Sequence, residues 1–426
     1  MSKSFAITKC RLIGTEGSSL GQGKEYNLVG GDPRITYMES ILSPAIGLTV
    51  NFFDTSSVVS RLGLSGGEYI EITIDSGQSS LGKFELTSEH KMIINGVKDI
   101  RTGPQGQMAT LEAIPEELIV NETAKISKKF SGNISDHVKD ILTTDEKGIM
   151  TTKKLNEESS ANKYSFVGNF KRPIDIIQWL QPKASTEAEG GESFGFLFYE
   201  NLDGYYWQSI ETLLAKEPDK GDKYAKLEMP IEDYRKIIDE SGETNIDTVK
   251  NLRRGMYSNI TTYVDLETQV KTTEEFKISD IGSLELLPKL PAGLQDKPTR
   301  LMFRITDPGA MQKDSKKVEG EEDAMEKQQD LAKIQNKSYA RSTLLFSQSY
   351  NVALPFNPQL RAGNTIFLKF PLPDDDETKT DERRKLGDDK TNDPSGKYLI
   401  EGLKHIIGDG NAETQVSLIR DTFTAE

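Results

Sequence analysis

Cysteine and histidine are scarce in this sequence, and their scarcity excludes several kinds of site. The 426 residues include a single cysteine, Cys10, so no disulfide can form within the chain and no zinc site can be built from cysteines. The three histidines, His90, His137 and His405, lie far apart and show no metal-ligand spacing. We therefore predict no metal and no other cofactor. His405 is interpreted as a structural or surface histidine rather than a general base.

Long hydrophobic runs are also missing. Residues 46–53 are about as apolar as the chain becomes, which is far shorter than the roughly 20 residues that a membrane-spanning helix needs. The first residues lack the apolar stretch of a secretory signal. We expect no membrane insertion. Together with the single cysteine, this favours assembly in a reducing cytoplasm.

Positive charge is in deficit, and the motifs of common enzyme classes are not found. The chain has 53 Lys and Arg against 67 Asp and Glu, a formal net charge of -14, so we expect no basic face that wraps nucleic acid. There is no Gly-x-Ser-x-Gly elbow and no Gly-x-x-x-x-Gly-Lys-Ser/Thr loop. Most acids stand in solvated runs such as 319–323 and 374–377, where a catalytic carboxylate with a raised pKa is not expected. We predict that the chain is not an enzyme.

Short strand-like segments fill residues 1–115. In residues 68–75, isoleucines alternate with polar residues, which is the period of a half-buried antiparallel strand. Similar segments at 46–53, 83–87, 92–94 and 108–113 are separated by turns rich in glycine or serine. This spacing predicts an N-terminal β barrel or sandwich.

Residues 116–217 mix helices with strands. Ser135 is expected to cap a short helix, and a second helix should begin at Pro173 and end before Pro182. The strands 194–199 and 205–210 flank an Asp-Gly turn, which predicts a hairpin. The strand 194–199 is apolar on both faces, so both faces should be covered. The second cover could be a neighbouring subunit or the same domain, and the sequence leaves both open.

The remaining chain divides into two further regions. Residues 218–340 form a mixed insertion with strands near 258–264 and a charged, mostly exposed helix between 313 and 336. Residues 341–426 return to β structure, interrupted by an acidic segment at 371–393 that should be mobile unless a partner orders it. The predicted fold class is α+β and β-dominated, with several domains that need not be continuous in sequence.

Two blocks of sequence resemble the central hub proteins of contractile-tailed phage baseplates. The first has a Gly-Asn turn, a helix that begins at a Lys-x-Pro and ends in Trp-Leu, and an aromatic hairpin with Phe-Tyr-Glu-Asn and Asp-Gly-Tyr. The second covers 363–368, 396–400 and 413–418. The residues that carry the motif of the first block are Gly168, Asn169, Pro173, Trp179, Tyr199, Glu200, Asn201, Gly204 and Ser209.

The resemblance implies a structural protein of the virion tail baseplate. It implies two antiparallel β barrels like those of tail tubes, separated by α/β insertions, and a homotrimeric ring that joins the tail tube protein to the central spike protein among other baseplate proteins. DNA would pass through the ring without specific binding. Because bound phosphates would stall DNA, we expect a lumen of acidic and neutral polar residues, with Glu71 and Asp75 as candidates.

Two alternative functions stay open. One is a tail-associated peptidoglycan hydrolase. The other is a receptor-binding or carbohydrate-binding tail protein, for which the aromatic run Tyr205, Tyr206 and Trp207 would form the binding platform.

Overall fold

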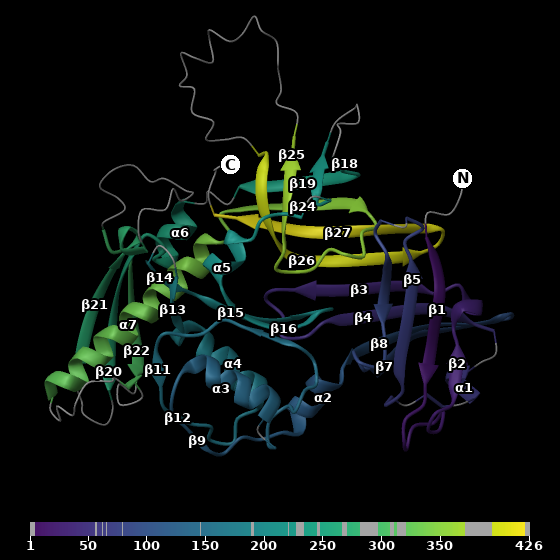
Figure 1. Cartoon of the computed structure of the whole chain (residues 1–426), viewed down its shortest axis with the longest axis horizontal. Coiled ribbons are helices and arrows are strands. Elements are labelled where there is room, and N and C mark those ends of the chain that lie inside the picture. The colour runs from purple at the N-terminus through teal and green to yellow at the C-terminus, as the bar shows by residue number, and fades with distance from the viewer. Residues whose placement is uncertain are drawn as a thin grey trace, which may run out of the picture.

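The computed structural model describes residues 5–421 apart from 56–57, 62, 65, 79, 145, 189–190, 220, 227–233, 245–247, 266–270, 282–296, 307–310, 313–320 and 371–393. The chain is β-dominated, with 48% strand and 20% helix, as the sequence predicts. Figure 1 shows a large sheet on one side of the molecule, and a helical region with a smaller sheet on the other.

One mixed sheet of 15 strands combines strands from the first and the last parts of the described chain. From the N-terminal part come β1 (Ala6–Ile13), β2 (Glu25–Asn27), β3 (Arg34–Ser40), β4 (Gly47–Asp54), β5 (Tyr69–Asp75), β6 (Lys83–Leu86), β7 (Met92–Gly103) and β8 (Gly106–Pro115). From the later part come β17 (Lys223–Ala225), β18 (Arg235–Lys236), β19 (Asp239–Thr244), β24 (Gln348–Pro355), β25 (Thr365–Lys369), β26 (Gly396–Gly408) and β27 (Asn411–Arg420). Short helices η1 (Val29–Gly31) and α1 (Val58–Arg61) interrupt the first set.

The two sets of strands are joined where β3 pairs with β26. The antiparallel register runs from Ser40 opposite Gly402 to Ile35 opposite Ile407, and Figure 1 shows the two strands side by side across the middle of the molecule. Within the described residues the strands form no closed barrel. The two-barrel arrangement and the boundaries 1–115, 116–217, 218–340 and 341–426 therefore stay predictions.

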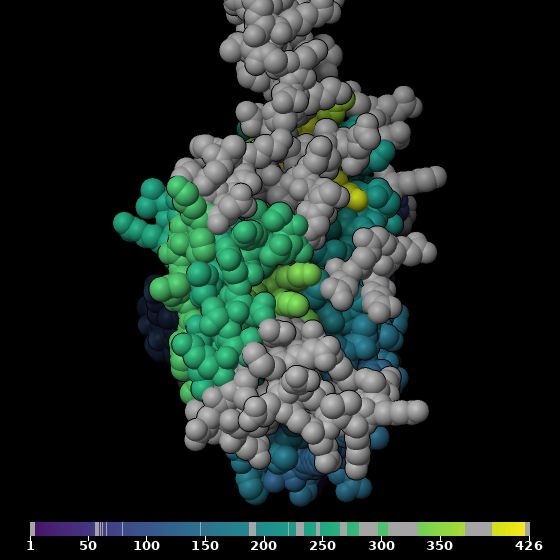
Figure 2. Space-filling view, turned by 90° about the vertical axis from the view of Figure 1, so that its left-hand side faces the viewer, coloured from purple at the N-terminus to yellow at the C-terminus, as the bar shows by residue number. Residues whose placement is uncertain are grey.

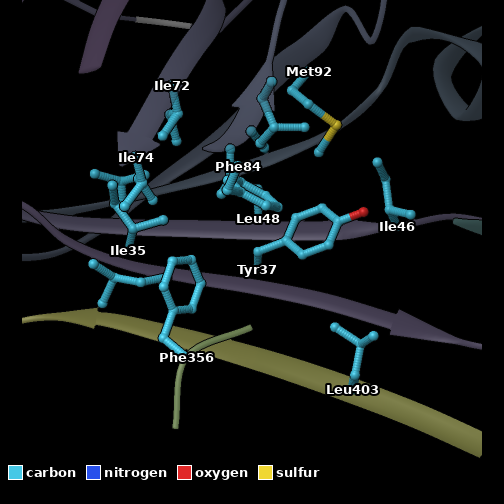
Figure 3. Packing of buried hydrophobic residues seen from close by; sticks show 14 of the residues in the cluster. Ile35, Tyr37, Ile46, Leu48, Ile72, Ile74, Phe84, Met92, Phe356 and Leu403 are labelled. Carbon is cyan, nitrogen blue, oxygen red and sulfur yellow. The ribbon is translucent and has the colours of Figure 1, made fainter. Parts of the chain in front are cut away.

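A single hydrophobic core underlies this joined sheet. Alternate residues of the longer strands point into it, and the isoleucines of β5 are fully buried, as their alternation predicts. In Figure 3, Tyr37 and Leu48 from the first set of strands lie close to Phe356 and Leu403 from the last part of the chain. Residues more than 300 positions apart thus share one core.

The α/β region lies beside the large sheet and has a core of its own. Pro173 occupies the first turn of α4 (Pro173–Leu180), which ends before the short η3 turn (Gln181–Lys183), as expected. The expectation for Ser135 is wrong, because Asn133 holds the N-cap position of α3 (Ile134–Lys139) and Ser135 bonds to Ser160 instead. The elements are α2 (Glu116–Thr123), β9 (Lys129–Phe130), α3 (Ile134–Lys139), η2 (Asp140–Thr144), β10 (Leu155–Glu157), β11 (Lys163–Tyr164), β12 (Phe166–Val167), α4 (Pro173–Leu180), η3 (Gln181–Lys183), β13 (Ser185–Ala188), β14 (Gly191–Phe194), β15 (Phe196–Asn201), β16 (Gly204–Ser209) and α5 (Ile210–Ala215).

A three-stranded sheet and the long helix α7 (Glu321–Leu344) form the far end of the molecule (Figure 1). The sheet has the order β21 (Lys271–Lys277), β20 (Ser258–Asp265), β22 (Arg300–Thr306), and α6 (Thr248–Arg254), η4 (Ile278–Ile281) and β23 (Met311–Gln312) lie nearby in the chain. The expectation of a mostly exposed helix is wrong for the described side chains of α7. Leu331, Ala332, Ala340 and Leu344 are buried, because the helix packs between this sheet and the α/β region.

Within the described residues, no helix is long and apolar enough to cross a membrane. In the same residues, no group of three or more His, Cys, Asp or Glu side chains is placed to hold a metal ion.

Candidate functional site: the hairpin junction

The hairpin β15–β16 lies between two hydrophobic clusters of the chain. All six residues of β15 are buried. Phe196 and Phe198 face the cluster that contains α4, whereas Leu197 and Tyr199 face a cluster with Leu399 and other residues of the large sheet. Both faces are therefore covered within one chain. The sequence left two possibilities for the second face, a neighbouring subunit or the same chain, and the structure shows the same chain.

The hairpin turn needs its glycine and its asparagine. Gly204 has φ +131°, and a Cβ atom there would lie 2.2 Å from the carbonyl oxygen of Lys154, so a larger residue would collide with backbone. The Asn201 side chain donates to the carbonyl of Ala362 at 3.2 Å and accepts from the N–H of Asp203 at 2.9 Å. These contacts fix the turn against the loop that precedes β25.

Glu200 is buried at the centre of a charged cluster. The ammonium group of Lys153 donates to Glu200 and to Glu117, each at 2.7 Å, and the other oxygen of Glu200 accepts from the N–H of Ile46 at 3.2 Å. Burial raises the pKa of Glu200 to about 7, although Lys153 opposes this shift. Lys153 thus pairs with two carboxylates in a region from which water is largely excluded.

Glu39 of β3 provides a second buried carboxylate, which the sequence analysis did not identify. It accepts from the Tyr37 hydroxyl at 2.7 Å and from the N–H groups of Leu202 and Ala362, each at 2.8 Å. Burial raises the pKa of Glu39, while Arg361 lowers it. One side chain therefore connects the large sheet, the hairpin turn and the loop before β25. Its position in the sequence could have indicated its burial, because Glu39 follows the buried Ile35 and Tyr37 at intervals of two along the same strand face.

We name this group the hairpin junction, defined by Glu39, Glu117, Lys153, Glu200 and Asn201. A pocket of about 420 Å³ lies beside it and is lined by residues that include His90, Lys153 and Glu200. The charged atoms already bond to neighbouring segments of the chain. The arrangement is therefore suited to holding the hairpin rigidly on the large sheet.

Ser209 ends the hairpin and begins the next helix. Its hydroxyl accepts from the N–H of Thr212 at 3.3 Å, which caps α5, and donates to Glu158 at 3.0 Å. The sequence motif placed Ser209 at this strand end without indicating either partner.

The Gly-Asn turn and Trp179 lie in the α/β region, apart from the hairpin junction. A Cβ on Gly168 would lie 2.7 Å from the carbonyl oxygen of Ile126, and Asn169 has φ +50° in the left-handed region. The ammonium of Lys183 lies 3.7 Å from the centre of a Trp179 ring. Burial lowers the pKa of Lys183 to about 7. These residues fix the entry and the end of α4.

The two candidate lumen acids differ in their surroundings. Glu71 is buried and forms ion pairs with Lys9 and Arg11, the latter at 2.9 Å. Asp75 is partly exposed and lies 4.0 Å from Lys83. Cations thus stand beside both carboxylates, and for Glu71 they balance the charge. Their place in a lumen stays a prediction.

His405 and two residues of the aromatic run, Tyr205 and Trp207, belong to the protein core. His405 is fully buried, its Nδ1 lies 2.9 Å from the Thr414 hydroxyl, and burial lowers its pKa to about 3. This confirms a structural histidine. Trp207 and Tyr205 are also buried. The hypothesis that these two residues form an exposed carbohydrate platform is therefore wrong.

Comparisons with known proteins identify the fold. No protein-family model and no curated protein matches the chain. The solved structure of the tail protein from Neisseria meningitidis MC58 matches with a TM-score of 0.53 and 12% identity, and the match covers 98% of this chain and 97% of that one. The chain has a tail-protein fold. The resemblance predicted from the two sequence blocks is thus confirmed in the fold.

Two further tail proteins were found at lower similarity. The 43 kDa tail protein of prophage MuSo2 from Shewanella oneidensis has 9% identity and a TM-score of 0.47, covering 97% of this chain and 98% of that one. Prophage tail protein gp18 from Listeria monocytogenes EGD-e has 9% identity and a TM-score of 0.46, covering 98% and 96%. The tail-protein fold assigned above depends on the Neisseria structure alone.

Proposed function

We propose that the chain is a structural hub of a contractile phage tail baseplate. In this role three copies form a ring that joins the tail tube to the central spike and lets DNA pass. The protein would assemble in the host cytoplasm and act in the virion tail. The proposed role is structural and includes no catalysis.

The observation that carries the proposal is the match to a tail protein along nearly the whole of both chains. A match limited to one domain would support a shared module, whereas this one includes the large sheet, the α/β region and the end with α7. The hub motif adds support, because Glu200 and Asn201 belong to the buried hairpin junction and Gly204 lies in the adjoining hairpin turn. A rigid body suits a part that transmits load between tube and spike.

The mass of the assembled particle tests this proposal. The purified chain is mixed with tail tube and spike proteins from the same phage, and its mass is measured by light scattering, with negative-stain images of its shape. We expect a particle mass that corresponds to three copies of this chain together with the bound partners, and images that show a three-fold ring. A chain that stays monomeric with both partners present would contradict the hub.

A peptidoglycan zymogram tests the structural role separately. We expect no cleared band from the folded chain, with lysozyme as the positive control. A cleared band that persists after repurification would favour the hydrolase alternative.

A further inference from the structure

The sheet β21–β20–β22 has one covered face and one open face. On the covered face, the Tyr263 hydroxyl donates to the carbonyl of Ala332 in α7 at 3.2 Å, and Arg304 donates to Gln335 at 3.4 Å. Residues that alternate with these point away from α7. Figure 2 shows this end of the molecule, with the green surface of the sheet and α7 toward the viewer.

The open face carries a row of exposed apolar side chains on β22. Leu301 is 79% exposed, Phe303 65% and Ile305 62%, and Leu301 is the most exposed large hydrophobic side chain of the described residues. The register places Ile260 and Val264 of β20 beside the two ends of this row. Contiguous apolar surface of this kind typically marks an interaction site.

β22 is also an edge strand. It pairs in parallel with β20 over seven consecutive residues without a register shift, and within the described residues no strand pairs with its other side. Edge strands are usually protected by proline, a bulge or charged residues on the exposed face. β22 has no proline, and its exposed row is apolar. The N–H and C=O groups on its outer side, which pair with no described strand, can therefore accept a further strand.

Among the described residues, positive charge gathers near the start of this edge, in a chain whose net charge is -14. Arg300 donates to the carbonyl of Arg254 at 3.2 Å and to the Tyr339 hydroxyl at 3.4 Å, and both partners are neutral, so these bonds leave its charge in place. Lys297, Arg253 and Arg254 are exposed near the start of the strand. The local charge is thus opposite in sign to that of the whole molecule, which favours an acidic partner.

We propose that the free edge of β22 binds an extended segment of another protein by strand addition, in which apolar residues alternate with acidic ones. Main-chain hydrogen bonds to the edge would provide affinity, the row Leu301, Phe303 and Ile305 would pack against the apolar residues, and the arginines would attract the acids. The proposal concerns a docking edge and does not depend on the ring.

Peptide binding to the full chain tests it. The probe is a fluorescent peptide in which valine and isoleucine alternate with glutamate, and binding is followed by anisotropy at low and high salt. We expect saturable binding that weakens with salt. A peptide with lysine in place of glutamate, or one with N-methylated alternate residues, should bind about tenfold more weakly or worse.

Matched variants locate the site. Phe303→Ser should weaken binding about tenfold, because an exposed aromatic contact is lost, and Arg300→Gln should weaken it and reduce its salt dependence. Leu42→Ser removes a comparably exposed side chain elsewhere and should leave binding unchanged. Circular dichroism confirms that each variant is folded. Binding that is absent, or equal for all variants, would overturn the proposal.

Two other occupants give distinct results. If a second copy occupies the edge, light scattering will show self-association that Phe303→Ser abolishes, and the proposal fails. If the chain's own segment 282–296, which lies outside the described residues, occupies it, then replacing that segment with a Gly-Ser link should increase peptide affinity strongly. That result would also overturn the proposal.

Discussion

Lys153 is the residue on which the charge balance of the hairpin junction depends. Its ammonium lies 2.7 Å from carboxylate oxygens of both Glu117 and Glu200, and its side chain is buried. A buried ion pair adds little net stability compared with apolar residues, but the loss of one partner leaves an uncompensated charge. The sequence motif included Glu200 but gave no indication of its cation.

We predict that Lys153→Met destabilises the chain by about 3–5 kcal/mol. Methionine has a similar volume to lysine, so the fall in unfolding free energy arises from the missing charge rather than from a cavity. The loss should be greater at pH 8 than at pH 5, because protonation of Glu200 removes its buried charge. Urea unfolding at the two pH values measures both effects.

Lys139→Met is the matched control for this prediction. Lys139 pairs with Glu157 at 2.8 Å, but its side chain is exposed to solvent, so its removal should leave the free energy of unfolding nearly unchanged. Similar losses for the two variants would show that Lys153 does not neutralise a desolvated pair.

His405 gives the chain a dependence on pH that opposes that of Glu200. The native state keeps His405 neutral down to about pH 3, whereas the unfolded chain protonates it below its ordinary pKa of 6.5. His405 therefore lowers stability as the pH falls from 6.5 toward 3. Glu200, with a pKa raised to about 7, holds a proton that the unfolded chain releases above 4.5, so its contribution falls as the pH rises from 4.5 to 7.

We predict that His405→Gln removes the first of these two contributions. The difference in unfolding free energy between the native chain and the variant should shrink by about 1 kcal/mol between pH 7 and pH 5.5. Urea unfolding at both pH values measures it, and Glu200 cancels because it is present in both proteins. An unchanged difference would mean that His405 is protonated in the folded state.

The two strands that flank residues 371–393 are held together without that segment. β25 and β26 pair antiparallel, and the Ser395 hydroxyl accepts from the N–H of Phe370 at 3.0 Å. The segment itself lies outside the described residues, so its expected mobility stays a prediction. These contacts already hold the end of β25 next to the start of β26.

We predict that a short Gly-Ser link in place of residues 371–393 leaves the chain stable. Closure entropy changes by only about 0.6 kcal/mol per doubling of loop length, so Tm should change by no more than about 3 °C. Differential scanning calorimetry measures it. A large fall in Tm would show that the segment packs on the core.

For α7, the amino-acid pattern predicted the element but not its burial. The segment is rich in charged residues, which favours an exposed helix. Its buried end instead carries charge that is paired, since Arg341 contacts both Glu211 and Asp421. Charge composition is therefore an unreliable guide to exposure where partners come from distant parts of the chain.

The whole molecule combines a net negative charge with one positive edge. At a net charge of -14 per chain, a ring of several copies should repel DNA, although the cations near β22 have the opposite sign. A hub that passes DNA must not retain it, because each phosphate contact adds affinity that depends on salt. Whether the ring retains DNA therefore depends on whether these cations face the lumen.

We predict that the assembled ring is not retained on DNA at low salt. The measurement is elution from immobilised duplex DNA as the salt concentration rises. Retention that disappears in Arg300→Gln would assign the contact to the β22 edge. Retention that survives this change would contradict a lumen of acidic and neutral polar residues.

The sequence alone determined the local features of this protein. The alternation of isoleucine in β5, proline at the start of α4 and the Asp-Gly turn of the hairpin each depend on neighbours within a few residues, so their pattern is sufficient. The two hub-like blocks likewise depend on adjacent residues, and the likeness to tail proteins that they indicated is confirmed in the fold, whereas the two barrels stay a prediction. The motif residues Gly168 and Gly204 are explained by backbone atoms that a side chain would strike.

Only the tertiary structure decided which distant segments meet. The pairing of β3 with β26, the covering of both faces of β15 and the contact of Glu39 with Ala362 join residues far apart in sequence. Glu71 shows the same limit, since its alternation predicted a solvent-facing acid while Lys9 and Arg11 of β1 bury and neutralise it. The period of a strand tells which residues share a face, but the strand order and register that cover that face depend on the free energy of the whole fold.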